Sequence, residues 1–192
     1  VDLVCQGITG DAASSLGDSK ATLALLSTLS AGGGSGLTFA RAGTATYTDA
    51  TGAMQVAAAD QPRLNHDPVT LAPLGILIEG ARTNLFLQSG APVTRTVTVT
   101  AQPYALSFRG AGSITLSGAH AATLTGPGGA ARAGLVFTPT AGSLTLTVAG
   151  DVQMVQLEAG NHATSYIPTA AASVTRAADS LQATLGGDKW RS

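Results

Sequence analysis

Residues 94–100 read Thr-Arg-Thr-Val-Thr-Val-Thr, and residues 143–148 read Ser-Leu-Thr-Leu-Thr-Val. In both runs small hydroxyl residues alternate with apolar ones, and successive side chains of a strand point to opposite faces of a sheet. One polar face and one apolar face are typical of an antiparallel sheet that covers a core on one side. The two runs therefore predict β-strands in an all-β fold.

Three further short runs between residues 104 and 138 repeat this period of two. In residues 104–109 we expect Tyr104, Leu106 and Phe108 to face the core and the residues between them to face solvent. Turns rich in Gly and Pro separate the runs, a pattern that indicates an antiparallel β-sandwich.

Residues 152–158 read Val-Gln-Met-Val-Gln-Leu-Glu and break the alternation once, near Met154. A single break of this kind predicts a β-bulge. Because the segment is apolar on both sides of the break, we expect it to be a central strand.

The chain divides into four segments by composition. Residues 1–36 hold a predicted helix over residues 18–29 and the glycine-rich run at 32–36, so we interpret them as an N-terminal attachment segment that ends in a flexible joint. The helix could equally pack on the main domain. We expect the remaining segments to be a small β and loop connector, the sandwich itself and a C-terminal tail, at residues 37–79, 80–180 and 181–192.

Charged residues make up 11% of the chain and the formal net charge is −1, against roughly 25% charged residues in an average soluble domain. This balance predicts no nucleic-acid partner, which normally requires a basic face, and no polybasic membrane anchor. No apolar run approaches the ~20 residues needed to cross a bilayer, so we expect no membrane insertion. The surface is then either kept soluble by hydroxyl groups or partly covered in an assembly. Cys5 is the only cysteine, so we expect no internal disulfide and no metal cluster built on cysteine. Asp60 and Asn65 lie near His66, but their spacing matches no known calcium loop, so we expect no metal site and no cofactor.

Glu79 and Glu158 are the only glutamates, and each ends an apolar run. A glycosidase needs two carboxylates that face one another, but a partly buried carboxylate is more often paired with a cation. We therefore predict a structural ion pair between these strand-end carboxylates and Arg82 or Arg176, with catalysis as the alternative.

Sugar recognition usually combines an aromatic side chain with polar groups beside it. The sequence offers few aromatic residues, and 4% of the chain is Phe, Trp or Tyr. We take as candidate glycan contacts three polar residues and one tyrosine: Asn84, Arg109, Asn161 and Tyr166.

Several segments of the sequence resemble segments that recur in one protein family. Residues 37–47 read LTFARAGTATY, residues 74–85 contain LGILIE and ARTNL, and QLE, TSYIPT and TRAAD follow between residues 156 and 179. Together they are similar to phage head-spike and fibre proteins and to their relatives in tail fibres and gene-transfer particles. The resemblance covers residues 37–180. Within the segment 37–47, this chain has Gly43 at a position where the family usually has Ser.

The resemblance implies a carbohydrate-binding-like jelly roll over residues 80–180 and a place in the virion. It implies other virion proteins as partners, a homo-oligomer, and adhesion to host surface polysaccharide or decoration of the particle. It supplies no catalytic residues, so we expect no enzyme. A purely structural cap or connector is the alternative, and a polysaccharide depolymerase is a more distant one.

Overall fold

The computed structural model of the chain describes residues 37–183, and there it contains strands and no helix. The prediction of an all-β fold with antiparallel sheets is confirmed. The predicted helix, the glycine-rich joint and most of the predicted tail lie outside the described residues. Among those residues no helix is long and apolar enough to span a membrane.

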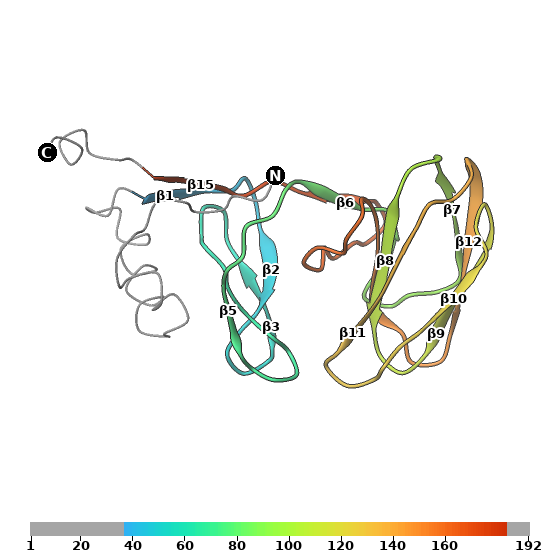
Figure 1. The fold of residues 1–192 in the computed structure, drawn as a ribbon, viewed down its shortest axis with the longest axis horizontal. Coiled ribbons are helices and arrows are strands. Elements are labelled where there is room, and N and C mark those ends of the chain that lie inside the picture. Colours follow the sequence, from blue (N-terminus) through green and yellow to red (C-terminus); the bar gives the residue numbers. More distant parts are fainter. Residues whose placement is uncertain (1–36, 184–192) are drawn as a thin grey trace, which may run out of the picture.

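Two antiparallel sheets make up the larger of two lobes, on the right in Figure 1. The first sheet has the order β10 (Ala122–Thr125), β9 (Ser113–Gly118), β12 (Gly142–Ala149) and β7 (Arg95–Val99). The second has the order β11 (Arg132–Phe137), β8 (Tyr104–Arg109) and β13 (Gln153–Ala159). We call these seven strands the large lobe.

One hydrophobic core lies within the large lobe, and both sheets contribute to it. Ile114 and Leu116 of β9 and Leu144 and Leu146 of β12 are at most 2% exposed. The alternation predicted for these two strands is confirmed, because their hydroxyl residues point outward. Removing a side chain from such a core costs about 2–5 kcal/mol for Leu or Ile to Ala. The residues of this core that are almost completely buried are Phe86, Leu106, Phe108, Ile114, Leu116, Leu144, Leu146, Val155 and Leu157.

Strand β8 is buried on both faces, so the prediction of a solvent face for Ala105 and Ser107 was wrong. These two residues lie opposite Glu158 and Gln156 of β13. The side chains of Gln156 and Glu158 hydrogen-bond to residues 164–165. A segment far along the chain therefore covers this second face, which no local pattern could indicate.

Strand β13 has the predicted β-bulge, since its register with β8 shifts between Gln153 and Gln156. Met154 adopts a φ of 53° there, a conformation that few residues other than Gly take up. The expectation that this segment is the central strand was wrong, because β8 holds that position and β13 lies at the edge.

The open edge of β13 is covered by the chain around β6 (Arg82–Asn84). The amide of Leu85 donates to the carbonyl of Leu157 at 2.8 Å, and that of Val155 donates to the carbonyl of Ser89 at 3.0 Å. Strand β6 also pairs with β14 (Val174–Arg176). The segment before the large lobe, which contains β6, and the segment after it, which contains β14, therefore lie side by side.

The small lobe, on the left in Figure 1, consists of three short strand pairs. Hairpins form from β2 (Ala45–Thr48) with β3 (Met54–Ala57), and from β4 (Leu64–His66) with β5 (Pro73–Ile76). The third pair joins β1 (Leu37–Ala40) to β15 (Ser180–Ala183). The segment expected to begin a tail at residue 181 therefore starts as a strand.

Asp49 holds the turn of the first hairpin. Its Oδ1 accepts hydrogen bonds from the amide and hydroxyl of Thr51 and from the amide of Ala53. Its Oδ2 accepts one from Gln55. These bonds, led by that of the Thr51 hydroxyl, lower the pKa of Asp49 to about 2.

Candidate functional site

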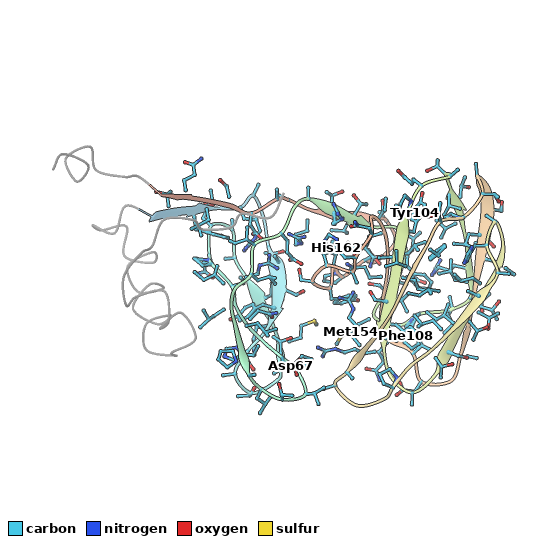
Figure 2. All side chains as sticks on the ribbon, viewed as in Figure 1. Asp67, Tyr104, Phe108, Met154 and His162 are labelled. Atoms are coloured by element: carbon cyan, nitrogen blue, oxygen red, sulfur yellow. The ribbon has the colours of Figure 1, made fainter. Side chains whose placement is uncertain are left out.

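A cleft with a volume of about 290 Å³ lies between the two lobes. This volume is at the lower end of the range for small-molecule sites. The hairpins of the small lobe form one wall, and β8, β11, β13 and residues 163–166 form the other. Figure 2 places Met154, at the bulge of β13, on the side of the large lobe that faces the small lobe.

The cleft is lined in part by Glu79, whose carboxylate has several partners. Its Oε2 lies 2.9 Å from Nη1 of Arg63 and 3.5 Å from Nη2 of Arg176. The amide and hydroxyl of Ser165 donate to its two oxygens at 2.7 and 2.6 Å. Burial alone would raise the pKa of Glu79, but Arg176, the Ser165 donors and Arg63 together hold it below its ordinary value.

Asp179 extends this ionic network into the interior. Its side chain is fully buried and lies 3.2 Å from Nη1 of Arg41 and 2.5 Å from Nη2 of Arg63. The amide of Glu79 donates to the same carboxylate at 2.8 Å, and Arg176 lies 3.9 Å away. The network therefore connects the small lobe to the segment that follows β14.

The ion pair predicted between Glu158 and Arg82 or Arg176 is not formed in the described part of the chain. Glu158 is fully buried and accepts hydrogen bonds from the amide and hydroxyl of Thr164 at 2.6 and 2.7 Å and from Gln156 at 2.8 Å. Arg82 donates to the carbonyl of Ala81. Glu158 is thus bonded to neutral donors, whereas the predicted pair between Glu79 and Arg176 is formed, and Arg176 also lies 3.9 Å from Asp179.

Two arginines of the large lobe line the cleft together. Arg109 of β8 and Arg132 of β11 are direct partners in the strand register. Nη1 of Arg132 donates to the carbonyl of Thr164, whereas its Nη2 is buried without a hydrogen-bond partner. Within residues 37–183 neither arginine forms an ion pair. Burial lowers the pKa of Arg132, and the charge of Arg109 lowers it further against the opposing effect of Glu158.

The polar groups of the small lobe complete the cleft. The Asn65 carbonyl oxygen accepts a hydrogen bond from the amide of Thr48 at 2.9 Å, which fixes the side chain of Asn65 at the cleft wall. Nδ1 of His66 is buried without a partner. Tyr47 and Tyr166 contribute the aromatic surface.

The four predicted glycan contacts have different surroundings. Arg109 and Tyr166 line the cleft, although Tyr166 is 9% exposed and its hydroxyl bonds to Ser89 at 2.6 Å. Asn161 is exposed, bonds to His162 at 2.9 Å and does not line the cleft.

Asn84 is fully buried, and its side chain makes four hydrogen bonds. Its Nδ2 donates to the carbonyls of Val155 and Ile167, and its Oδ1 accepts from the amides of Phe86 and Leu157. No surface and no free polar atom remain for a ligand. Its role is structural, which corrects the expectation of a glycan contact.

Sequence reasoning missed Arg132 and Asn65 as members of the site. Both lie in short strands whose partners are set by register rather than by local composition. The only local signal is that Arg109 and Arg132 are charged residues at the ends of otherwise uncharged strands.

Comparisons of the chain with protein-family models, with curated proteins and with solved structures each found no match. Over residues 37–183 no group of three or more His, Cys, Asp or Glu side chains is placed to hold a metal ion.

Proposed function

We propose that this chain is a non-enzymatic phage virion protein of the head-spike or fibre type that binds a host surface glycan. The observation that supports this function best is the cleft between the lobes. Hydroxyl, amide, phenol and guanidinium groups converge there on a space of about 290 Å³. Sites for small polar ligands have this composition, with a few placed polar groups beside aromatic surface.

The proposal also rests on the sequence resemblance, which implies a jelly roll. We propose that the two sheets of the large lobe form a carbohydrate-binding-like jelly roll. Four strands and three strands enclose one core, and every pair of neighbours is antiparallel.

The carboxylates near the cleft support binding rather than hydrolysis. Within residues 37–183, Glu79 is the only carboxylate among the residues that line the cleft, and both of its oxygens are engaged. Glu158 is fully buried and bonded to Thr164. A glycosidase requires two carboxyl groups that reach the substrate from opposite sides.

Single sugar contacts are weak, so attachment to a cell surface requires many copies of the site. We therefore propose a homo-oligomer that is held in the virion by other virion proteins. The low content of charged residues, 11%, favours a surface that is partly covered in such an assembly.

The test is a glycan array that includes host capsule and lipopolysaccharide fragments, probed with a multivalent form of the protein. Ala163 is exposed and lines the cleft, so Ala163→Trp fills the cleft without replacing a buried residue. Ala121 is also exposed but does not line the cleft, so Ala121→Trp is the matched control. We expect the first variant to lose binding and the second to retain it. Absence of binding by the unmodified protein to every glycan would remove adhesion as its function.

A second candidate function, a structural cap or connector, is favoured by the outer face of the four-stranded sheet. Thr96 and Thr145 lie 3.0 Å apart there, and Thr115 and Thr123 lie 3.2 Å apart. The outward positions of β7, β9, β10 and β12 hold hydroxyl residues and alanine but no charge. If this face contacts neighbouring subunits, Thr145→Lys will dissociate the oligomer, as measured by light scattering. An unchanged mass would exclude this face as the contact.

A further inference from the structure

Arg109 and Arg132 place two positive charges beside each other on one wall of the cleft. They are opposite residues of neighbouring antiparallel strands, whose Cβ atoms lie roughly 4.5–5.5 Å apart. Like charges in this arrangement repel one another. An anion bound between the two arginines would relieve this repulsion.

The described part of the chain does not supply this anion. Glu79 is engaged by Arg63, Arg176 and Ser165, and Glu158 by Thr164 and Gln156. Neither carboxylate lies within ion-pair distance of Arg109 or Arg132. The charges of Glu158 and Glu79 therefore act on Arg132 only from beyond ion-pair distance, and within residues 37–183 neither guanidinium group has a direct ionic partner.

Two buried nitrogen atoms of residues that line the cleft also have no partner. Nη2 of Arg132 and Nδ1 of His66 are both inaccessible to solvent and both make no hydrogen bond. One belongs to the large lobe and the other to the small lobe. A buried polar atom without a partner is unfavourable, so a small shift of either side chain toward a ligand between the lobes would gain a hydrogen bond.

We propose that the cleft binds an acidic saccharide, with the sugar carboxylate held by Arg109 and Arg132. This inference rests on the proposed glycan-binding function and names its ligand class. The planar fork of a guanidinium matches the two oxygens of a carboxylate. Asn65 and His66 bond to the sugar hydroxyls from the opposite wall.

The rest of the lining distinguishes a sugar from a free inorganic anion. Met154 and Leu77 give the cleft apolar surface beside its polar groups, and Tyr47 adds an aromatic ring. The carbon-bearing faces of a sugar ring pack on such surface. An inorganic phosphate would use the two arginines and leave this surface uncovered.

Arg109→Gln is the variant that tests the proposal. Arg109 makes no ion pair within residues 37–183 and is not fully buried, so its replacement leaves the core intact. Arg132→Lys keeps the positive charge but removes the planar guanidinium group that can bond to both oxygens of a carboxylate. Arg95→Gln is the matched control, since Arg95 lies outside the cleft lining. Thermal unfolding of each variant verifies that it is folded.

The probes are oligogalacturonides and sialyl-oligosaccharides, their carboxyl-reduced counterparts, and inorganic phosphate, with affinities measured by calorimetry. We expect the unmodified protein to prefer an acidic probe over its reduced form by at least about tenfold, the effect of losing one charge-assisted contact. Arg109→Gln should abolish this preference, Arg132→Lys should reduce it, and Arg95→Gln should retain it.

Equal binding of acidic and reduced saccharides would overturn the acidic ligand and leave the proposed glycan-binding function standing. Binding of no saccharide at all would overturn both. If phosphate binds as tightly as the acidic saccharides, the site is an inorganic anion site and the proposal fails.

Discussion

Asp179 accepts a hydrogen bond of 2.5 Å from Nη2 of Arg63, although 116 positions separate the two residues in the sequence. Both side chains are fully buried. The pair joins the small lobe to the segment after β14, and Glu79, which lines the cleft, belongs to the same network. The ionic network thus fixes the geometry of one wall of the candidate site.

Asp179→Asn should destabilise the fold by about 3–5 kcal/mol, because it leaves buried arginines without their carboxylate. Arg41 and Arg63 both lie within 3.2 Å of this group. Urea unfolding followed by circular dichroism measures the loss. Asp151→Asn, at an exposed position, is the control and should change stability by less than about 0.5 kcal/mol. Equal stabilities of the two variants would mean that the buried network is energetically neutral.

Glu79 should make stability depend on pH in the acid range. Its pKa in the folded protein lies below its ordinary value of 4.5, so the folded state favours the ionised form. The resulting stabilisation is fully present above about pH 4.5 and is lost as the pH falls through the lower folded pKa. Glu79→Gln should show a shallower loss than the unmodified protein in denaturant titrations at several pH values. Parallel pH profiles would assign the acid sensitivity to other carboxylates.

Glu158→Ala should destabilise the protein by about 3 kcal/mol, the range expected when buried donors lose their acceptor. The affected donors are the Thr164 amide and hydroxyl and the Gln156 amide group. Glu158→Gln keeps the shape and one acceptor oxygen and should lose less. Thermal unfolding of both variants makes the comparison. Unchanged stability in Glu158→Ala would show that this carboxylate is free to serve another role.

Asn84→Ala should weaken the contact between the opening and closing segments of the large lobe. Four hydrogen bonds of one buried side chain are lost, and we expect a destabilisation of about 2–4 kcal/mol. Amide hydrogen exchange should become faster at Leu85 and Leu157, which depend on this side chain for their position. Thr83→Ala, on the exposed side of the same strand, should have little effect. Retained protection at Leu157 would argue that the backbone bonds hold this edge without Asn84.

The local pattern of the sequence predicted part of the fold correctly. The alternation at residues 143–148 placed Leu144 and Leu146 inward, and the single break at Met154 marked the bulge. These features depend on neighbouring residues alone. The second buried face of β8 could not be predicted, since residues 164–165 lie more than fifty positions away and cover it through Gln156 and Glu158.

Less of the candidate site than of the fold could be predicted from the sequence. Arg109 and Tyr166 line the cleft, and their role as glycan contacts stays a prediction, whereas Asn84 supports the fold from a fully buried position. The sequence contains Glu79, Glu158 and several arginines, but it does not show which carboxylate pairs with which arginine. That choice depends on the distances between segments after folding, because an ion pair forms only within about 4 Å.

The amino-acid sequence alone determined the strand-forming periods, the bulge at Met154 and the uncharged hydroxyl surface, because each of these follows from the order of adjacent side chains. The tertiary structure alone decided that Arg109 meets Arg132 across two strands, and that Arg176 pairs with Glu79 and Asp179 while neutral donors satisfy Glu158. Register and the docking of distant segments are properties of the whole packed chain, since they are selected by the burial of the entire core rather than by any one segment.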